Sequence, residues 1–425
     1  MNAPTAYELV RAHLHRALNA EDFHAPDLRG LVEQIVESHQ RAAASGLEGR
    51  VAFADPDEVV ARLIREVEGI GSEIEELEAD ANVEEIYGRD GELSYRLTSG
   101  EVKALATPVS AESILTVVQR LVAAAGEQLD GSKPRADGVR VILPSGRQGR
   151  LTASIPPRID GTVSFVLRLP QKRHVTLDDL VAWGSLTGPA ASLLAILMLV
   201  VRSKVLVIGP PGAGKTSMLD ALLRAVPAWR RTIVIEEERE LTAGLLNGEY
   251  WATSPVENME DLIRSARVAS PELIALGEVK GGEAFHLCMA GNLGTGVLAA
   301  VHADSTAKAF DALADAASLA MPSMTTGALR EKFKRTFEVV VYCGMDTVGG
   351  KNLRQVTEIS VVPPQSSEEL VSVTSIFKRA AVGEPMERNS TDLGPDLTER
   401  CNRVLRERCP GLTITDVLQG MEVTL

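Results

Sequence analysis

The segment Ile208–Thr216 reads Ile-Gly-Pro-Pro-Gly-Ala-Gly-Lys-Thr, a glycine-rich stretch that ends in lysine and threonine. It fits the spacing G-x-x-x-x-G-K-[ST] and lies between an apolar run typical of a buried strand, Val205–Ile208, and a helical run that begins at Ser217. In this context the glycines let backbone N–H groups turn toward phosphate oxygens, the lysine reaches the outer phosphates and the threonine binds Mg²⁺. A chance glycine turn is the alternative, and the matching flanks disfavour it. We therefore predict a site for ATP with Mg²⁺ formed by Gly209, Pro210, Pro211, Gly212, Ala213, Gly214, Lys215, Thr216 and Ser217.

Two later apolar runs are followed by glutamates that could assist phosphoryl transfer. The run Leu273–Leu276 leads into Gly277 and Glu278, and the run Thr232–Ile235 leads into Glu236. At the carboxyl edge of a parallel sheet, Glu278 is expected to hold Mg²⁺ directly or through water, and Glu236 to orient the attacking water. Either glutamate alone could be a solvated helix cap. Because glutamates follow two predicted strands that come after the phosphate loop in the sequence, we favour the catalytic interpretation.

Basic side chains complete the predicted site. His302 follows the apolar run Val297–Val301, where it could bond the γ-phosphate or the attacking water, although a lone histidine there is more often a satisfied core group. Phosphoryl transfer also needs positive charge on the γ-phosphate beyond the loop lysine, often from an arginine of another domain or subunit. Arg140, Arg150 and Arg168 lie in strands and loops of the preceding segment and are the candidates. Each of them alone is also typical of a surface residue.

The composition is that of an ordinary globular protein with an acidic balance. The 425 residues predict two or three domains, and hydrophobic and charged fractions of 45% and 24% argue against a disordered or fibrous chain. A net charge of −14 argues against a protein that coats nucleic acid, so no direct nucleic-acid partner is expected. The cysteines lack the spacing of a zinc site or a disulfide scaffold, which favours a reducing cytoplasm.

The sequence predicts neither a secretion signal nor a membrane-spanning helix. The N-terminus lacks a charged region followed by an apolar core, and the most apolar run, Ala190–Val201, is too short to cross ~30 Å of hydrocarbon. We predict that this run is a buried helix rather than a segment on a membrane surface. Any membrane contact is expected to be peripheral.

The spacing of apolar residues divides the chain into segments. Strands that alternate with helices predict an α/β domain with a mostly parallel sheet, which follows a smaller α+β domain. Within the α/β domain, Val339–Cys343 and Val356–Val361 should form a hairpin. The expected segments are helical residues 1–75, an α+β domain at 76–170, a linker at 171–180, the α/β domain at 181–380, and a tail with a short helix at 381–425.

The order of these motifs resembles the type II/type IV secretion ATPase family, and in particular the branch that powers assembly of tight-adherence (Flp) pili. The likeness extends from Ile64 to Phe377 and covers a large part of the chain. Beyond the phosphate loop, it rests on Ser154-Ile155-Pro156-Pro157, Ile235-Glu236-Glu237, Gly277-Glu278-Val279-Lys280-Gly281-Gly282 and Val301-His302-Ala303.

The resemblance implies a RecA-like ATPase domain behind the smaller α+β domain, with ATP held between them and the chains assembled as a homo-hexamer. It makes Glu236 the catalytic glutamate and Glu278 the Walker B glutamate, places His302 in the histidine box, and gives the three arginines a contact with phosphate. It also implies a cytoplasmic motor that lies at the inner face of the cell membrane and acts on inner-membrane platform proteins in pilus assembly or secretion.

The sequence departs from the pattern of that family at several positions. Lys280 stands for the usual arginine, Glu237 for an aspartate, and Leu293–Gly296 is shorter than the usual Thr-Gly-His-Asp-Gly and lacks its histidine. These departures leave open a second interpretation, a structural subunit that closes on ATP without useful hydrolysis. A third interpretation is a DNA-transfer ATPase for conjugation, which the acidic net charge disfavours.

Overall fold

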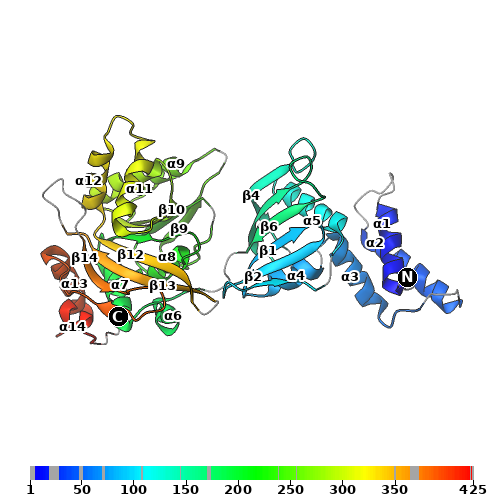
Figure 1. The fold of residues 1–425 in the computed structure, drawn as a ribbon, viewed down its shortest axis with the longest axis horizontal. Helices are drawn as coiled ribbons and strands as arrows, with labels where there is room; N and C mark the ends of the chain where they lie inside the picture. Colours follow the sequence, from blue (N-terminus) through cyan, green and yellow to red (C-terminus); the bar gives the residue numbers. More distant parts are fainter. Residues whose placement is uncertain are drawn as a thin grey trace. The chain divides into compact units, whose positions relative to one another are not determined.

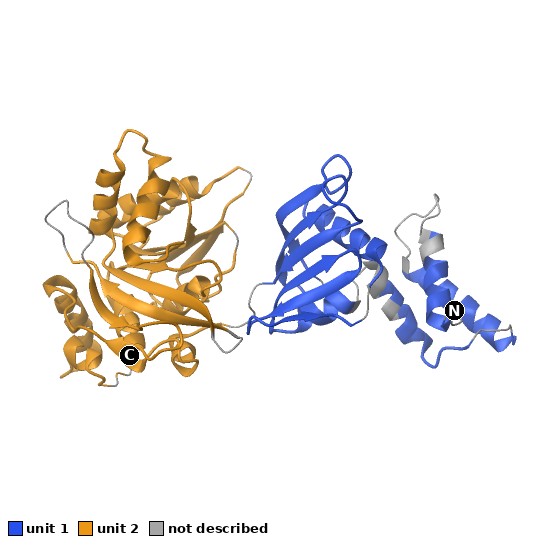
Figure 2. Ribbon diagram, viewed as in Figure 1, with its two compact units in different colours: residues 1–172 blue, residues 173–425 orange. Residues whose placement is uncertain are grey.

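The computed structural model describes residues 5–18, 28–46, 51–68, 72–106, 109–143, 145–169, 174–237, 239–254, 256–348, 351–363, 373–421 and 423. The chain divides into two compact units, residues 1–172 and residues 173–425 (Figure 2). Residues 171–173 of the predicted linker lie outside the described residues. The rest of that predicted linker belongs to the second unit, since Val175, Leu177 and Leu180 are buried in its core.

The first unit begins with a helical segment that has its own small core (Figure 1). Its helices are α1 (Ala6–Leu18), α2 (Leu28–Ala44) and α3 (Pro56–Glu68). The apolar residues recur at helical spacing, so each helix buries one face. The buried side chains include Val10 and Leu14 of α1, Val32 and Val36 of α2, and Leu63 of α3.

The rest of the first unit is a six-stranded antiparallel sheet with the order β3-β2-β1-β6-β5-β4. Burial alternates along β5, so one face of the sheet is apolar and the other is exposed. The apolar face packs with helix α5, which begins after the cap residue Ser110, and with α4. The elements are α4 (Ser72–Ala79), β1 (Val83–Arg89), β2 (Glu92–Leu97), β3 (Val102–Ala104), α5 (Ala111–Ala124), β4 (Arg135–Ile142), β5 (Gln148–Ser154) and β6 (Ser164–Arg168).

The second unit is built on a nine-stranded sheet with the order β15-β14-β13-β12-β7-β11-β10-β8-β9. The strands from β12 to β9 in this order pair in parallel, and the remaining pairs are antiparallel. The predicted hairpin is confirmed as β12 and β13, with longer strands than expected. The strands are β7 (Lys204–Ile208), β8 (Thr232–Glu236), β9 (Gly248–Ala252), β10 (Leu273–Val279), β11 (Gly296–Val301), β12 (Val339–Val348), β13 (Lys351–Val361), β14 (Thr374–Lys378) and β15 (Glu387–Arg388).

Helices cover both faces of this sheet and bury a separate apolar cluster on each (Figure 1). Alternate residues of β7 point to the two faces, with Val205 and Val207 in one cluster and Leu206 and Ile208 in the other. The helices of the first face are α6 (Leu177–Ala182), α7 (Gly188–Leu199), α8 (Lys215–Arg224), α13 (Pro395–Arg408) and α14 (Ile414–Leu418). Those of the second are α9 (Met259–Val268), α10 (Glu283–Asn292), α11 (Thr306–Ser318) and α12 (Thr326–Thr336).

Two segments whose packing the sequence left open lie in this core. The apolar run predicted as a buried helix is α7, in which Leu193, Leu194 and Ile196 are fully buried. Residues 381–425, expected as a tail, contribute Leu397 of α13 and Ile414 of α14 to the same cluster as α7. In the described part of the chain, no helix combines the length and apolar character needed to cross a membrane.

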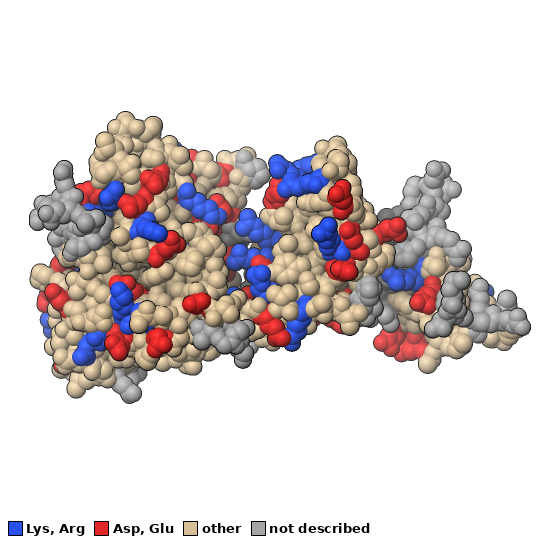
Figure 3. Space-filling model, viewed as in Figure 1, with Lys and Arg blue, Asp and Glu red and all other residues tan. Residues whose placement is uncertain are grey.

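On the face that Figure 3 shows, the acidic side chains do not form one continuous field. Acidic and basic side chains are interspersed on the visible face of both units (Figure 3). Local charge, rather than the total, therefore decides what each part of the surface attracts.

Candidate nucleotide-binding site

The predicted phosphate loop connects β7 to α8, and its glycines have a backbone that other residues rarely adopt. Gly209, Gly212 and Gly214 have φ values of 151°, 77° and 91°. A Cβ at Gly209 would lie 2.2 Å from the carbonyl oxygen of Cys343 in β12, so that position accepts glycine alone. A Cβ at Gly214 would meet nothing within 4 Å, so there the left-handed backbone itself selects glycine. The loop leads into the N-terminus of α8, whose N–H groups attract anions, and it fits the phosphates of a nucleotide.

Lys215 is the buried cation of this loop. The residue is 8% exposed, and Nζ donates to the carbonyl oxygens of Gly209 and Pro210 at 3.0 and 3.1 Å. Nζ also lies 2.8 Å from Nδ1 of His302, and since an ammonium can only donate, Nδ1 is the acceptor. Phosphate oxygens are acceptors of the same kind as these carbonyls and could replace them. The predicted ligands Thr216 and Ser217 follow in the first turn of α8, and Ser217 is half-buried.

A chain of polar contacts leads from Lys215 to two glutamates and a second lysine. His302 Nε2 pairs with Oε1 of Glu278, and Oε2 of Glu278 lies 2.8 Å from Nζ of Lys280. That same Nζ lies 2.8 Å from Oε2 of Glu237. The two carboxylates raise the pKa of Lys280, and together they outweigh the opposite effect of its partial burial. Lys215, His302 and Glu278 are thus brought together, and Lys280 joins them to Glu237.

The strand that carries Glu278 is longer than the sequence indicated. We expected it to end at Leu276, which is wrong, because β10 continues to Val279. Its pairing with β11 is irregular between Leu276 and Val279, and Glu278 lies in this irregular stretch. The residues Gly277 and Glu278 interrupt the apolar run, which is why the sequence pattern ended too early.

Glu236, the other predicted glutamate, is held apart from this chain. It ends β8, is 4% exposed, and accepts hydrogen bonds from the N–H groups of Leu241 and Glu240 at 3.2 Å. Burial raises its pKa to about 7, although the backbone bonds act in the opposite direction. Among the contacts of the described residues, Glu236 reaches neither Lys215 nor Glu278. Its carboxylate nevertheless lies against the strand of Glu278, since a Cβ at Gly277 would be 3.1 Å from Oε1 of Glu236.

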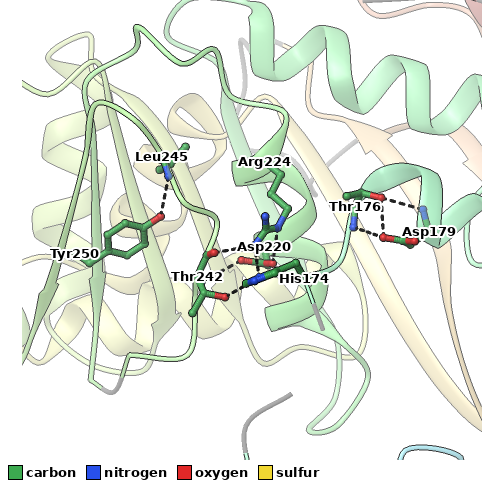
Figure 4. A network of polar contacts seen from close by, with 8 residues as sticks. All are labelled: His174, Thr176, Asp179, Asp220, Arg224, Thr242, Leu245 and Tyr250. Carbon is green, nitrogen blue, oxygen red and sulfur yellow. Dashed lines mark hydrogen bonds and ion pairs between the residues drawn. The ribbon is translucent and has the colours of Figure 1, made fainter. Parts of the chain in front are cut away.

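The segment that holds Glu236 is tied to helix α8 (Figure 4). Asp220 of α8 accepts from the N–H of Thr242 at 3.1 Å and pairs with Arg224 at 2.9 Å. Arg224 donates to the carbonyl oxygen of Thr242 at 2.7 Å and contacts Nδ1 of His174 at 2.6 Å. Because Thr242 directly follows the residues that donate to Glu236, these bonds fix the position of the donors. Sequence reasoning missed Asp220, since one acidic residue inside a helix carries no signal of such a role.

The three candidate arginines lie in register on the sheet of the first unit. Arg140 of β4 is opposite Arg150 of β5, which in turn is opposite Arg168 of β6. All three are exposed, while their neighbours Leu151 and Leu167 are buried on the other face. Like charges directly opposite each other destabilise a sheet, whereas an anion bound across them removes that repulsion. The arginine row therefore fits a ligand rich in negative charge.

Comparisons with known proteins give the family and agree with the fold. The model of the family described as "Type II/IV secretion system protein" matches residues 55–341, more than half of the chain. The chain belongs to this family. A putative conjugal transfer protein of Mycobacterium tuberculosis, Rv3659c, is 30% identical over 259 residues, which cover 57% of this chain and 71% of that protein. The type IV secretion system protein VirB11 of Brucella suis biovar 1 is 30% identical over 205 residues, which cover 41% and 56%.

A solved structure of the pilus retraction motor PilT with bound ADP shares the fold. It has a TM-score of 0.51 and 17% identity, and the match covers 69% of this chain and 83% of that one. The predicted family and the predicted fold class, a RecA-like α/β domain after a smaller α+β domain, are confirmed. As a member of a family of secretion and pilus ATPases, this chain is a nucleotide-binding ATPase of the type II/IV secretion class.

Proposed function

We propose that this chain binds ATP with Mg²⁺ at residues 209–217 and hydrolyses it as one subunit of a hexameric motor. The observation that carries the proposal is the contact chain from Lys215 through His302 to Glu278 beside the glycine loop. It supplies a cation for phosphate oxygens and a carboxylate for a metal ion. A histidine joins the two, so that both are oriented before a ligand arrives.

In this proposal, Lys215 exchanges the carbonyl oxygens of its own loop for the β- and γ-phosphate oxygens. The hydroxyl of Thr216 and the carboxylate of Glu278 would hold Mg²⁺, which when bound offsets the negative charge of the phosphates. His302 keeps the carboxylate of Glu278 turned toward the loop. Lys280 compensates the charge of Glu278 on its other side.

Glu236 is the proposed acceptor of the proton of the attacking water. A carboxyl group with a pKa of about 7 is close to the operating pH, where general-base catalysis is most effective. To act, Glu236 has to exchange its bonds to the N–H groups of Glu240 and Leu241 for the water. The ties between this segment and α8 would let a change at the phosphate loop reach those bonds.

Arg140, Arg150 and Arg168 are proposed to supply further positive charge to the outer phosphate, from the same or a neighbouring subunit. Their exposed row supports this role, because three guanidinium groups in register favour an anion. Closure of the first unit on the second around the nucleotide would then produce the motion of the motor, driven by tighter binding in the closed state.

We assign the motor to assembly of a tight-adherence (Flp) pilus, at the cytoplasmic face of the inner membrane and in contact with platform proteins. Conjugative transfer is the second candidate, and it is favoured by the names of relatives such as the conjugal transfer protein of Mycobacterium tuberculosis. Binding of DNA by the purified chain that weakens steeply with salt would support conjugation. Absence of DNA binding at low salt supports the pilus or protein-secretion assignment.

Steady-state phosphate release by the purified full chain with ATP and Mg²⁺ tests hydrolysis. Lys215→Ala and Glu278→Gln should each lower the rate by about 100-fold or more, since each removes charge stabilisation in the transition state. The matched control Glu257→Gln changes an exposed carboxylate and should leave the rate unchanged. A hexamer that binds a non-hydrolysable ATP analogue but releases no phosphate would overturn the motor. It would support the structural-subunit alternative suggested by the shortened Leu293–Gly296 segment.

A further inference from the structure

Five loops of the second unit carry exposed apolar side chains along one edge of its sheet. The loops precede β7, β11, β10, β8 and β9, which are neighbours in that order. The side chains are Val201, Leu293, Trp229 and Leu246, together with Val268, the last residue of α9 directly before its loop. Because these five strands are parallel, all five loops lie at their amino-terminal edge. The phosphate loop and Glu278 lie at the opposite, carboxyl edge. We call the five loops the apolar edge.

Contacts between successive loops fix this arrangement. The loops before β7 and β11 meet where the guanidinium of Arg202 lies 3.5 Å from the position of a Cβ at Gly294. The N–H of Gly296 donates to the carbonyl oxygen of Glu272 at 2.9 Å, which joins the loops before β11 and β10. The remaining links are Arg231 Nε to Ala269 O at 2.8 Å and Asn247 Nδ2 to Trp229 O at 3.0 Å. Adjacent strands lie ~4.8 Å apart, so the row of five loops spans about 20 Å. The exposed apolar side chains therefore form one row rather than scattered positions.

The loops hold these side chains outward from a fixed backbone. Trp229 is 56% exposed although its ring contacts the guanidinium of Arg230, which is buried and donates to the carbonyl oxygens at the end of α7. Leu246 is 86% exposed, and the preceding residue Leu245 donates its N–H to the hydroxyl of Tyr250 (Figure 4). Exposure of Trp229 and Leu246 is thus a property of ordered loops.

Two residues of the apolar edge are held in a strained backbone. Arg202 and Ser270 have φ values of 62° and 56°, in the left-handed region that favours glycine. Strain of this kind is retained where the surroundings impose it, and it gathers at functional surfaces. At residue 202 it keeps a guanidinium group in the turn before β7.

The charge at the apolar edge is positive. Arg202 and Arg267 are exposed, and the described residues give neither of them an ion-pair partner. The carboxylates near this edge are already engaged. Glu272, in the loop before β10, accepts from the N–H of Arg231, Glu249 of β9 pairs with Arg231, and Glu338, which precedes the parallel strand β12, pairs with Arg400. A partner that binds at this edge therefore meets the guanidinium groups of Arg202 and Arg267 and the exposed apolar side chains, while the three carboxylates are held by arginine side chains or by a backbone N–H.

We infer that the apolar edge docks directly on the surface of an anionic lipid bilayer. Tryptophan and aliphatic tips enter the boundary between headgroups and acyl chains, while flanking arginines meet headgroup phosphates. Since the whole chain carries −14, approach to an anionic surface requires local positive charge, which the exposed arginines supply at this edge.

Co-sedimentation of the full chain with vesicles, without nucleotide, tests this docking. Binding is expected to vesicles of phosphatidylglycerol and phosphatidylcholine, and to be weaker by about tenfold or more with phosphatidylcholine alone. The double variant Trp229→Ser/Leu246→Ser should bind the anionic vesicles about tenfold or more weakly, since it removes the largest inserted groups. The matched control Trp183→Ser replaces a tryptophan that is 51% exposed but lies outside these loops, and it should bind like the wild type.

The arginines have their own test. Arg267→Glu should weaken binding at ~0.1 M salt by about tenfold and much less at ~1 M salt, because screening removes the attraction at high salt. Lys308→Glu makes the same change of charge at the carboxyl edge and should have little effect. Equal losses in the edge variants and their controls, or no loss in any, would overturn the inference.

Contact between copies of the chain is distinguished from lipid docking by the oligomeric state. If Trp229→Ser/Leu246→Ser changes the oligomeric state in the absence of vesicles, the edge is a contact between copies and the inference is wrong. Circular dichroism of each variant verifies that the exposed substitutions leave the fold intact. Docking on lipid does not depend on hydrolysis: a chain inactive in phosphate release that still binds anionic vesicles through these loops contradicts the proposed motor alone.

Discussion

Replacement of Glu236 by glutamine should make the stability of the second unit less dependent on pH. The carboxyl group of Glu236 is 4% exposed, and burial is the main reason why its pKa is raised to about 7. The folded chain therefore holds a proton on Glu236 at pH values where the unfolded chain has released it. As the pH rises above the ordinary value of 4.5, the unfolded state is favoured, and the loss of stability levels off above about pH 7.

The size of the effect follows from the two pKa values. Between about pH 5 and about pH 8, ionisation of Glu236 should cost the folded unit about 2–3 kcal/mol, at about 1.4 kcal/mol for each pH unit between the two values. Glutamine has nearly the same shape and stays neutral. Near pH 5 the variant and the wild type should therefore differ little, and near pH 8 Glu236→Gln should be more stable by about 2–3 kcal/mol.

Urea unfolding followed by tryptophan fluorescence measures this difference. All three tryptophans, Trp183, Trp229 and Trp251, lie in the second unit, so the signal reports that unit. Glu257→Gln is the control, because an exposed carboxylate keeps its solvation in both states and its replacement should give no pH-dependent difference. An unchanged gap between Glu236→Gln and wild type from about pH 5 to about pH 8 would refute the burial argument.

Further changes test the loop, the contact chain and the arginine row. Gly209→Ala should destabilise the second unit in urea by about 3 kcal/mol or more, since its Cβ would meet the carbonyl oxygen of Cys343, whereas Gly214→Ala should cost about 1 kcal/mol for its backbone alone. Lys280→Ala should lower kcat for phosphate release about tenfold with little change in KM, because it leaves two neighbouring carboxylates without their shared cation. Arg150→Ala should also lower kcat about tenfold, because it removes one of the three positive charges proposed to contact the outer phosphate.

The sequence predicted best those elements whose local residue pattern is compatible with a single backbone conformation. Apolar β-branched runs gave the central parallel strands, because a strand covered on both faces has apolar residues throughout. The glycine loop was predicted with its flanking strand and helix, since its spacing is fixed by backbone geometry. Leu397 and its neighbours gave α13 an apolar face, but periodicity alone does not say that this face packs with α7.

What the sequence could not supply is set by pairing between distant segments and by the conformation of loops. The register that aligns Arg140, Arg150 and Arg168 depends on how β4, β5 and β6 pair, and a shift of one residue would send each arginine to the buried face. The bonds from Glu240 and Leu241 to Glu236 are local, across four and five residues, but they depend on the conformation of the loop after β8. The residue types alone specify neither the register of the arginines nor this loop conformation.

The bonds of Lys215 connect nucleotide binding to the ends of two other strands. Its ammonium group donates a hydrogen bond to Nδ1 of His302, and Nε2 of the same ring pairs with the carboxylate of Glu278. A phosphate that attracts Nζ away from the ring frees Nδ1 of His302, so the contacts of this ring, and through it of Glu278, differ between the empty and the filled loop. Lys280 extends the effect to Glu237, which follows β8. A ligand shifts a conformational equilibrium only through contacts that differ between the two states, and these are the contacts that must differ here.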